Sequence, residues 1–229
     1  LSPVFYFKGI SGAFFAERYL YIPSFGLALA VASLLERTKQ RQRFLLAWGA
    51  IIVFAVMTVI RNQDWKDSET LYRSAVSVNE ANSHFQSSLG DISLRRGHDS
   101  AARERFEAAL RYIDEGVYSF EPHEKYRALI GMGALAARSK EYSRARGYLT
   151  EALEVNPNGD WAYLYLGGVL LQADRDFSGA MEHFKKAIEL GPINEVARDY
   201  MGIALLNSGR YREAIPYFQE SLEINPNYA

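Results

Sequence analysis

The feature that most constrains this chain is a repeat of about 34 residues in its C-terminal part. Pro157, Pro192 and Pro226 follow one another at intervals of 35 and 34 residues. Before each proline the same residue types recur in one order: an apolar residue followed by Gly, an aromatic residue, Ala, and an aromatic residue or Leu. A fixed period of this length indicates units that stack on their neighbours, because one unit alone cannot bury its apolar face. The sequence therefore predicts an all-α solenoid of helix pairs.

These units resemble the tetratricopeptide repeat (TPR). In that family, small Gly and Ala residues let the two helices of a pair approach closely, and a Pro ends the second helix. The additional residue of the 35-residue interval falls at 172–176. The family's aromatic residue at the eleventh position is absent, since Ser93, Ala136, Leu170 and Leu205 stand there. The frame places a TPR array at 61–229, with a half repeat at 65–78 and repeats at about 83–114, 124–157, 160–192 and 195–226.

The resemblance implies a right-handed superhelix whose concave face is lined by the first helix of each pair. A groove of this kind can hold an extended peptide or a partner helix. The alternative for any single residue is an ordinary solvated helix face, and the mixture of charge signs specifies no ligand. By register, the residues expected on the concave face are His84, Ser87, Asp91, Arg95, Arg127, Arg138, Trp161, Gln172, Asp199 and Asn207.

The first sixty residues differ sharply from the array. Two uncharged runs of seventeen residues, 19–35 and 44–60, flank a loop at 36–43 in which four of eight residues are basic. Seventeen residues are at the short end of what spans a bilayer as a helix, and short basic loops stay in the cytoplasm. The sequence therefore predicts a transmembrane helical hairpin, preceded by an interfacial segment at 1–18, that places the array on the non-cytoplasmic side: periplasmic, extracellular or in the ER lumen. The alternative is two buried helices of a soluble domain.

Composition and motifs exclude several classes of function. A net charge of −1 creates no field that would recruit nucleic acid, and the absence of cysteine excludes disulfides and cysteine-based metal sites. The four histidines show no pair at metal-site spacing, and the chain has no HExxH, GxSxG or P-loop motif. We therefore expect no metal site, no cofactor and no catalytic centre within residues 61–229. Because the chain begins at Leu1 inside an apolar run, we expect it to be the C-terminal portion of a longer protein.

A second resemblance covers nearly the whole chain. Glu17-Arg18-Tyr19-Leu20-Tyr21-Ile22-Pro23-Ser24 is followed by a span, a basic loop, a second span and then TPRs. This order resembles the C-terminal part of the transmembrane-and-tetratricopeptide-repeat family of protein O-mannosyltransferases. The resemblance implies a GT-C-type membrane enzyme that uses a polyprenyl-phosphate sugar and acts on the non-cytoplasmic side. Its acidic general-base candidates would lie upstream of Leu1.

In that setting, Arg18 would contact the lipid-linked phosphate as a bidentate cation and Glu17 would orient it. The alternative is an Arg–Glu pair that snorkels at the membrane edge. Two other functions remain open at this point: a non-catalytic membrane-anchored TPR scaffold and a soluble TPR adaptor. All three would bind a protein or peptide partner, and the first two would also contact the lipid bilayer.

Overall fold

The computed structural model describes residues 66–116 and 122–226, together with residues 40, 42, 48–53, 55, 56 and 59. The chain divides into two compact units, Leu1–Gln63 and Asp64–Ala229. The interfacial segment 1–18 and the predicted span 19–35 lie outside the described residues, and most of the basic loop does too. The predicted span 44–60 is described only in part.

The described part of the first unit is helical and rich in exposed apolar side chains. Residues 48–53 form a continuous helical stretch. Trp48, Ile52 and Val59 are 56%, 60% and 62% exposed, far above what a packed core would leave. Among the described residues, no helix is both long and apolar enough to cross a membrane.

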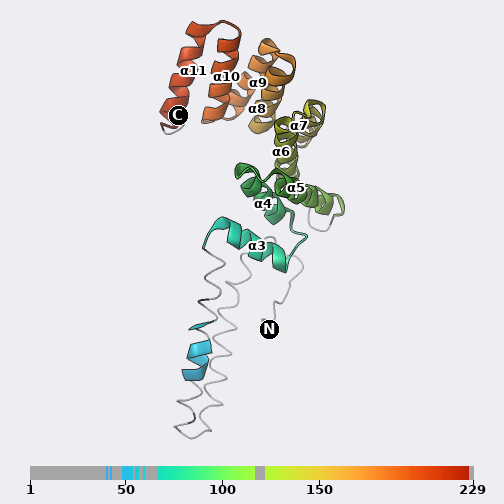
Figure 1. The fold of residues 1–229 in the computed structure, drawn as a ribbon, viewed down its shortest axis with the longest axis vertical. Coiled ribbons are helices and arrows are strands. Elements are labelled where there is room, and N and C mark those ends of the chain that lie inside the picture. The colour runs from blue at the N-terminus through green and yellow to red at the C-terminus, as the bar shows by residue number, and fades with distance from the viewer. Residues whose placement is uncertain are drawn as a thin grey trace. The chain divides into compact units, whose positions relative to one another are not determined.

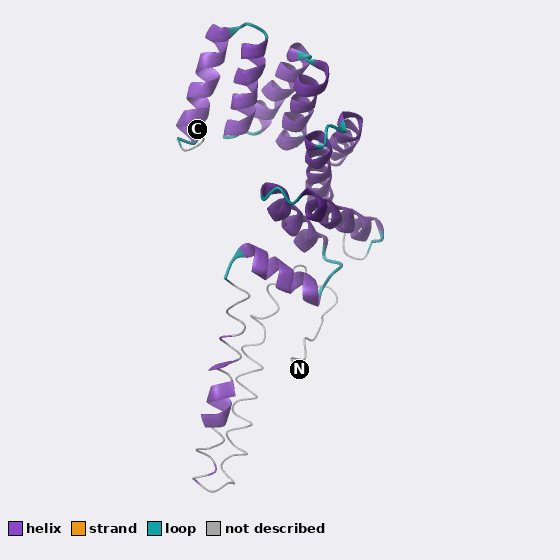
Figure 2. Ribbon diagram, in the orientation of Figure 1, coloured by secondary structure: helices purple, strands orange, loops and turns teal. Residues whose placement is uncertain are grey.

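The second unit is built from helices alone, with no strand among its described residues (Figures 1 and 2). A single helix, α3 (Ser68–Val78), comes first and packs on α4. Four helix pairs then follow in chain order. The first pair is α4 (Ser83–Arg95) with α5 (Asp99–Asp114), and the second is α6 (Pro122–Arg138) with α7 (Tyr142–Val155). In the third pair, α8 (Asp160–Val169) is continued by the π-turn η2 (Leu170–Asp174) and is followed by α9 (Phe177–Leu190). The fourth pair is α10 (Glu195–Asn207) with α11 (Tyr211–Ile224).

We call α4, α6, α8 with η2, and α10 the inner helices, and α5, α7, α9 and α11 the outer helices. Each inner helix packs on the outer helix of its own pair, and each outer helix packs on the next inner helix. The inner helices α4, α6 and α8 also contact one another in sequence. This arrangement confirms the predicted all-α solenoid of helix pairs.

A glycine facing a large apolar side chain holds each pair together. A Cβ atom built on Gly90 would lie 2.6 Å from Phe106, and one built on Gly167 would lie 2.6 Å from Phe184. Such distances are closer than real side-chain contacts, so only glycine lets the two helices approach to this spacing. The same contact joins Gly133 to Leu149 and Gly202 to Phe218. The repeated apolar–Gly element in the sequence is therefore the closest point between the two helices of each pair.

The third pair holds one more residue than its neighbours, and a π-turn absorbs it. The turn after α4 contains a bond from the N–H of His98 to the carbonyl of Ser93, five residues earlier, at 2.9 Å. In the third pair the corresponding bond spans six residues, from the N–H of Asp176 to the carbonyl of Leu170, at 3.2 Å. Arg175 closes the turn with φ 52°, a left-handed conformation that Gly97 and Gly209 adopt in other turns.

A tyrosine from the preceding pair caps α8. The helix starts after Gly159, which has no side chain to accept a bond from the first turn. The N–H of Ala162 donates both to the carbonyl of Gly159 at 3.2 Å and to the hydroxyl of Tyr126 at 3.3 Å. A Cβ at position 159 would lie 2.4 Å from that hydroxyl, so the glycine makes room for it. Burial raises the pKa of Tyr126 to about 12.

Candidate functional site

The inner helices carry every groove residue that the sequence predicts in the array. His84, Ser87, Asp91 and Arg95 lie on α4, Arg127 and Arg138 on α6, Trp161 on α8, Gln172 on η2, and Asp199 and Asn207 on α10. Glu17 and Arg18 lie outside the described residues. Ser87 is fully buried, whereas His84, Arg95, Arg138, Trp161, Gln172 and Asn207 are exposed.

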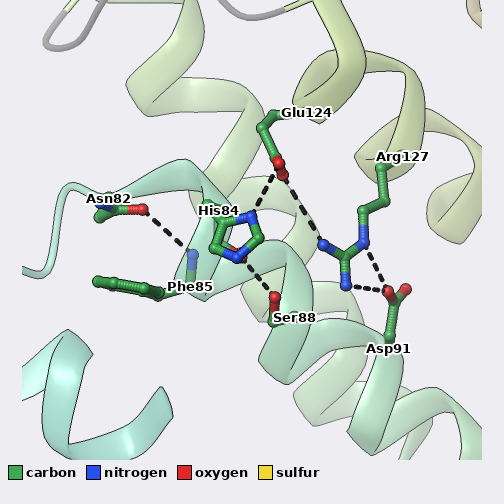
Figure 3. A network of polar contacts seen from close by, with 7 residues as sticks. All are labelled: Asn82, His84, Phe85, Ser88, Asp91, Glu124 and Arg127. Atoms are coloured by element: carbon green, nitrogen blue, oxygen red, sulfur yellow. Dashed lines mark hydrogen bonds and ion pairs between the residues drawn. The ribbon is translucent and has the colours of Figure 1, made fainter. Parts of the chain in front are cut away.

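A network of polar contacts joins α4 to α6 (Figure 3). Arg127 donates from Nε and Nη2 to one carboxylate oxygen of Asp91, at 2.7 Å in both cases. On the same side of α6, Glu124 Oε1 lies 2.8 Å from His84 Nδ1. Arg127 Nη1 lies 4.0 Å from the other oxygen of Glu124, so the guanidinium links the two carboxylates. Two side-chain contacts therefore connect α4 to α6: Arg127 with Asp91, which are 36 residues apart in the sequence, and Glu124 with His84, which are 40 residues apart.

The two carboxylates respond differently to this surrounding. Burial raises the pKa of Asp91 above its usual value, and this outweighs the opposing effect of Arg127. Burial also acts to raise the pKa of Glu124, but its hydrogen bond to His84 and the charge of Arg127 hold that pKa below its usual value. Glu124 therefore remains ionised at neutral pH although its side chain is only 6% exposed.

The sequence did not identify Glu124 as a groove residue. It lies in the first turn of α6, at the first residue of the repeat expected at 124–157. Its burial and its contact with α4 do not follow from the repeat register. An acid three residues before an expected cation, Arg127, on the same helix is the signal that points to it.

Arg138 connects the far end of α6 to the turn between α4 and α5. It donates to the carbonyl of Leu94 at 3.3 Å and to Asp99 at 2.5 Å. The Leu94 carbonyl belongs to the last turn of α4, where carbonyls lack helical partners and attract cations. Arg138 therefore links the second helix pair to the first.

Farther along the inner helices the side chains become aromatic and apolar. The rings of Trp161 and Tyr165 lie 6.2 Å apart on α8. Burial raises the pKa of Tyr165 above its usual value. On α10, Ile203 and Leu206 are 38% and 40% exposed.

Gly168 leaves an open place in this aromatic part of the surface. A Cβ atom built on Gly168 would have no neighbour within 4 Å, unlike the four glycines that face the outer helices. In the repeat register it occupies the same position as Asp91, Ala134 and Ile203. The surface is thus charged along α4 and α6, small at Ala134 and Gly168, and aromatic or aliphatic along α8 and α10. Such a surface can hold another chain; in the described residues no three acidic or histidine side chains gather in a way that could hold a metal ion.

Comparison with protein families identifies the type of repeat. The tetratricopeptide repeat family matches residues 57–116 and 130–194, and a second model of that family matches 200–228. Together these matches cover more than half of the 229 residues. The chain belongs to the tetratricopeptide repeat family.

The relatives of this TPR chain include protein O-mannosyl-transferases. It is 36% identical over 103 residues to protein O-mannosyl-transferase Tmtc2 of Drosophila melanogaster, which is 42% of this chain and 11% of the relative. It is 32% identical over 149 residues to Tmtc3 of the same species, covering 62% of this chain and 15% of the relative. The chain therefore spans only a small part of the length of these relatives.

Among solved structures, the TPR array is similar to the crystal structure of MamA. The two share 21% sequence identity with a TM-score of 0.50, over 72% of this chain and 91% of MamA. A likeness at this level of identity shows the shared fold.

Proposed function

We propose that this chain is the C-terminal part of a membrane-bound protein O-mannosyltransferase of the GT-C type, which takes its sugar from a polyprenyl-phosphate donor. In this proposal, the TPR array lies on the non-cytoplasmic side and docks protein partners or acceptors. The observation that carries it is the similarity to several protein O-mannosyl-transferases, among them human TMTC2 at 38% identity over 109 residues. A TPR array alone would not favour an enzyme, because the fold serves many functions.

The membrane hairpin is part of the proposal. Residues 48–53 are helical, and Trp48, Ile51, Ile52 and Val53 are each more than half exposed. A run of exposed large apolar side chains is costly in water and favourable in lipid. It supports a span at 44–60 that pairs with one at 19–35 through the basic loop. In this arrangement Glu17 and Arg18 lie on the same side as the array, where Arg18 would contact the lipid-linked phosphate.

Binding of a protein segment is the role we propose for the inner surface. Its polar side chains already pair with one another between α4 and α6, so they hold the surface in one shape before a partner arrives. The open place at Gly168 and the exposed apolar side chains on α8 and α10 provide contact area. These features suit an extended segment that lies across the inner helices.

Cysteine labelling in membranes tests the anchoring and the sidedness, because the chain has no cysteine of its own. Gln40→Cys places a thiol in the basic loop, and Gly147→Cys places one on α7, at an exposed glycine with no neighbour within 4 Å of its Cβ. The full chain is expressed in cells, and sealed spheroplasts are treated with a membrane-impermeant maleimide. We expect labelling of Gly147→Cys in intact spheroplasts and of Gln40→Cys only after detergent.

The reverse pattern would contradict the proposed sidedness. Release of the chain by alkaline carbonate would contradict the hairpin itself.

For the enzyme, sugar transfer from polyprenyl-phosphate mannose is measured in membranes that contain the full-length protein. We expect transfer to fall with Arg18→Ala and to recover in part with Arg18→Lys; unchanged transfer in both variants would exclude a role for this cation.

A further inference from the structure

The charges of the inner surface are nearly all paired within the array. Asp91 pairs with Arg127, and Glu124 contacts His84. Arg138 pairs with Asp99. These contacts leave little charge for a partner to recognise on most of α4 and α6.

Two groove charges differ from the rest. Arg95, in the last turn of α4, is exposed; its charge acts on Asp91 and it lines a hollow with Asp67 and Glu69, but no described carboxylate lies within ion-pair distance of it. Asp199, on α10, likewise has no cation within ion-pair distance in the described array. Both belong to the predicted concave face. They stand at opposite ends of the set of inner helices, one on the first and one on the last.

An apolar stretch on α8 and α10 lies on the side of Asp199, and the paired charges of α6 stand between it and Arg95. In this stretch Gly168 on α8 leaves open space, and Trp161 on the same helix and Ile203 on α10 have exposed side chains. A large apolar side chain placed over Gly168 would bury surface on both. Burial of one such side chain contributes about as much to the free energy of binding as any other single contact in a peptide complex.

The spacing sets the length of a segment that can reach both charges. Three steps separate α4 from α10 along the inner helices. Packed helices lie about 8–10 Å apart, so the span is about 30 Å. An extended chain covers about 3.3 Å per residue, which gives a segment of about nine residues.

We propose that the groove selects an extended peptide of about nine residues with an acidic residue at one end, a large apolar residue near the middle and a basic residue at the other end. The acid pairs with Arg95, the apolar side chain sits over Gly168, and the base pairs with Asp199. This inference rests on the proposed function, since it names the chemistry of the segment that the groove docks. The acidic residue can stand at either the N-terminal or the C-terminal end of the peptide, because a peptide can lie across the helices in either direction.

The test uses four nine-residue peptides with blocked ends, Phe in the middle and Ser or Gly spacers. Their end residues are Glu and Lys, Glu and Glu, Lys and Lys, or Gln and Gln. Binding of each fluorescein-labelled peptide to the full chain in detergent micelles is followed by fluorescence anisotropy. We expect the Glu/Lys peptide to bind most tightly, with each correct charge improving affinity about two- to fivefold, as for an exposed ion pair.

Reversal of one groove charge gives a sharper result. Arg95→Glu makes both ends acidic and should shift the preference to the Lys/Lys peptide, whereas Asp199→Arg should shift it to the Glu/Glu peptide. Arg212→Glu, at an exposed position on the outer helix α11, is the matched control and should leave the order unchanged. Neither groove charge forms an ion pair among the described residues, and the circular dichroism spectrum of each reversed variant checks that the fold is retained.

Different results would contradict the proposed docking role and the inferred charge selection. Gly168→Leu should weaken all four peptides more than tenfold, while Gly147→Leu on α7 should not. If Gly168→Leu has no effect on any of the four peptides, the groove does not dock the peptides and the proposed binding role is wrong. If Gly168→Leu abolishes binding but the four peptides bind equally, or the charge reversals leave the order unchanged, only the inferred charge selection is wrong.

Discussion

The first two helix pairs and the last two share one frame but fill it differently. On the inner helices of the first two pairs the buried residues include Gln86, Ser87, Ser88 and Glu124. In the last two pairs the buried polar residues are Asn194 and Ser221, and one apolar cluster that contains the fully buried Phe184 draws on all four helices. The glycine contacts that set the pair geometry are the same in both halves. The frame therefore depends on these contacts, and the inner side is free to differ and to carry function.

Truncation of the outer-helix aromatic residue should have the largest effect and should be similar in both halves. Phe106 and Phe184 are each 0% exposed and each faces an inner-helix glycine. We expect Phe106→Ala and Phe184→Ala each to lower the free energy of unfolding by about 3–5 kcal/mol. Urea unfolding followed by circular dichroism measures this. A small loss for Phe106→Ala beside a large one for Phe184→Ala would show that the two halves do not share a frame.

Loss of Glu124 should cost less and should affect only the first half. Glu124→Ala leaves His84 without its carboxylate partner and removes one of the two acids near Arg127. We expect a loss of about 1–3 kcal/mol in the free energy of unfolding. Glu124→Gln keeps the shape and an acceptor and should recover part of it. Equal stability of the alanine variant and the wild type would mean that the polar contacts do not hold α4 to α6.

The ionised state of Glu124 also predicts how the free energy of unfolding changes as the pH falls. Its pKa is lower in the folded chain than in the unfolded chain, so its contribution is present above its usual value and is lost as pH falls through the folded value. The pKa of Asp91 is raised, so that group acts in the opposite sense. We expect Glu124→Gln to lose less stability than the wild type between neutral pH and about pH 4. A parallel decline of both proteins would contradict the paired, ionised state of Glu124.

Tyr126→Phe should have a smaller effect at the junction between the two halves. Removing the hydroxyl leaves the N–H of Ala162 with only the Gly159 carbonyl as its acceptor and should cost about 0.5–1 kcal/mol. Because the pKa of Tyr126 rises to about 12, the unfolded chain releases this proton first. The hydroxyl's contribution is therefore present below about pH 10 and is lost as pH approaches 12. The stability difference between wild type and variant should shrink over this range; a constant difference would contradict the buried neutral hydroxyl.

Arg175→Gly should have the smallest effect and the opposite sign. Arg175 holds a left-handed conformation that a glycine adopts without strain, as at Gly97 and Gly209. We expect the variant to gain up to about 1 kcal/mol in the free energy of unfolding. Lys140→Gly, at the equivalent turn of the second pair, should behave alike because Lys140 has φ 61°. A loss of stability in both would show that these side chains contribute more than the strain removes.

The sequence was sufficient for the frame because the frame depends on residue types at fixed spacing. The apolar–Gly elements, the helix pairs and the helix carrying each predicted groove residue all followed from one period. The paired contacts did not, because a register assigns a residue to a face and not to a partner 36 or 40 residues away. Tyr126 was missed for the same reason, since its hydroxyl caps a helix of the next pair. The sequence also does not distinguish Gly168, which faces open space, from the adjacent Gly167, which contacts an outer helix.

Photocrosslinking at Trp161 tests most directly whether the groove docks a protein. Benzoylphenylalanine is introduced at Trp161, an exposed aromatic position on α8, or at Gly147 on α7, in the full-length protein and in the cells that produce it. We expect light-dependent adducts with one or a few proteins from position 161, lost when Gly168→Leu is added, and none from position 147. The same adducts from both positions, or no adduct from position 161 in a stably folded variant, would contradict the account.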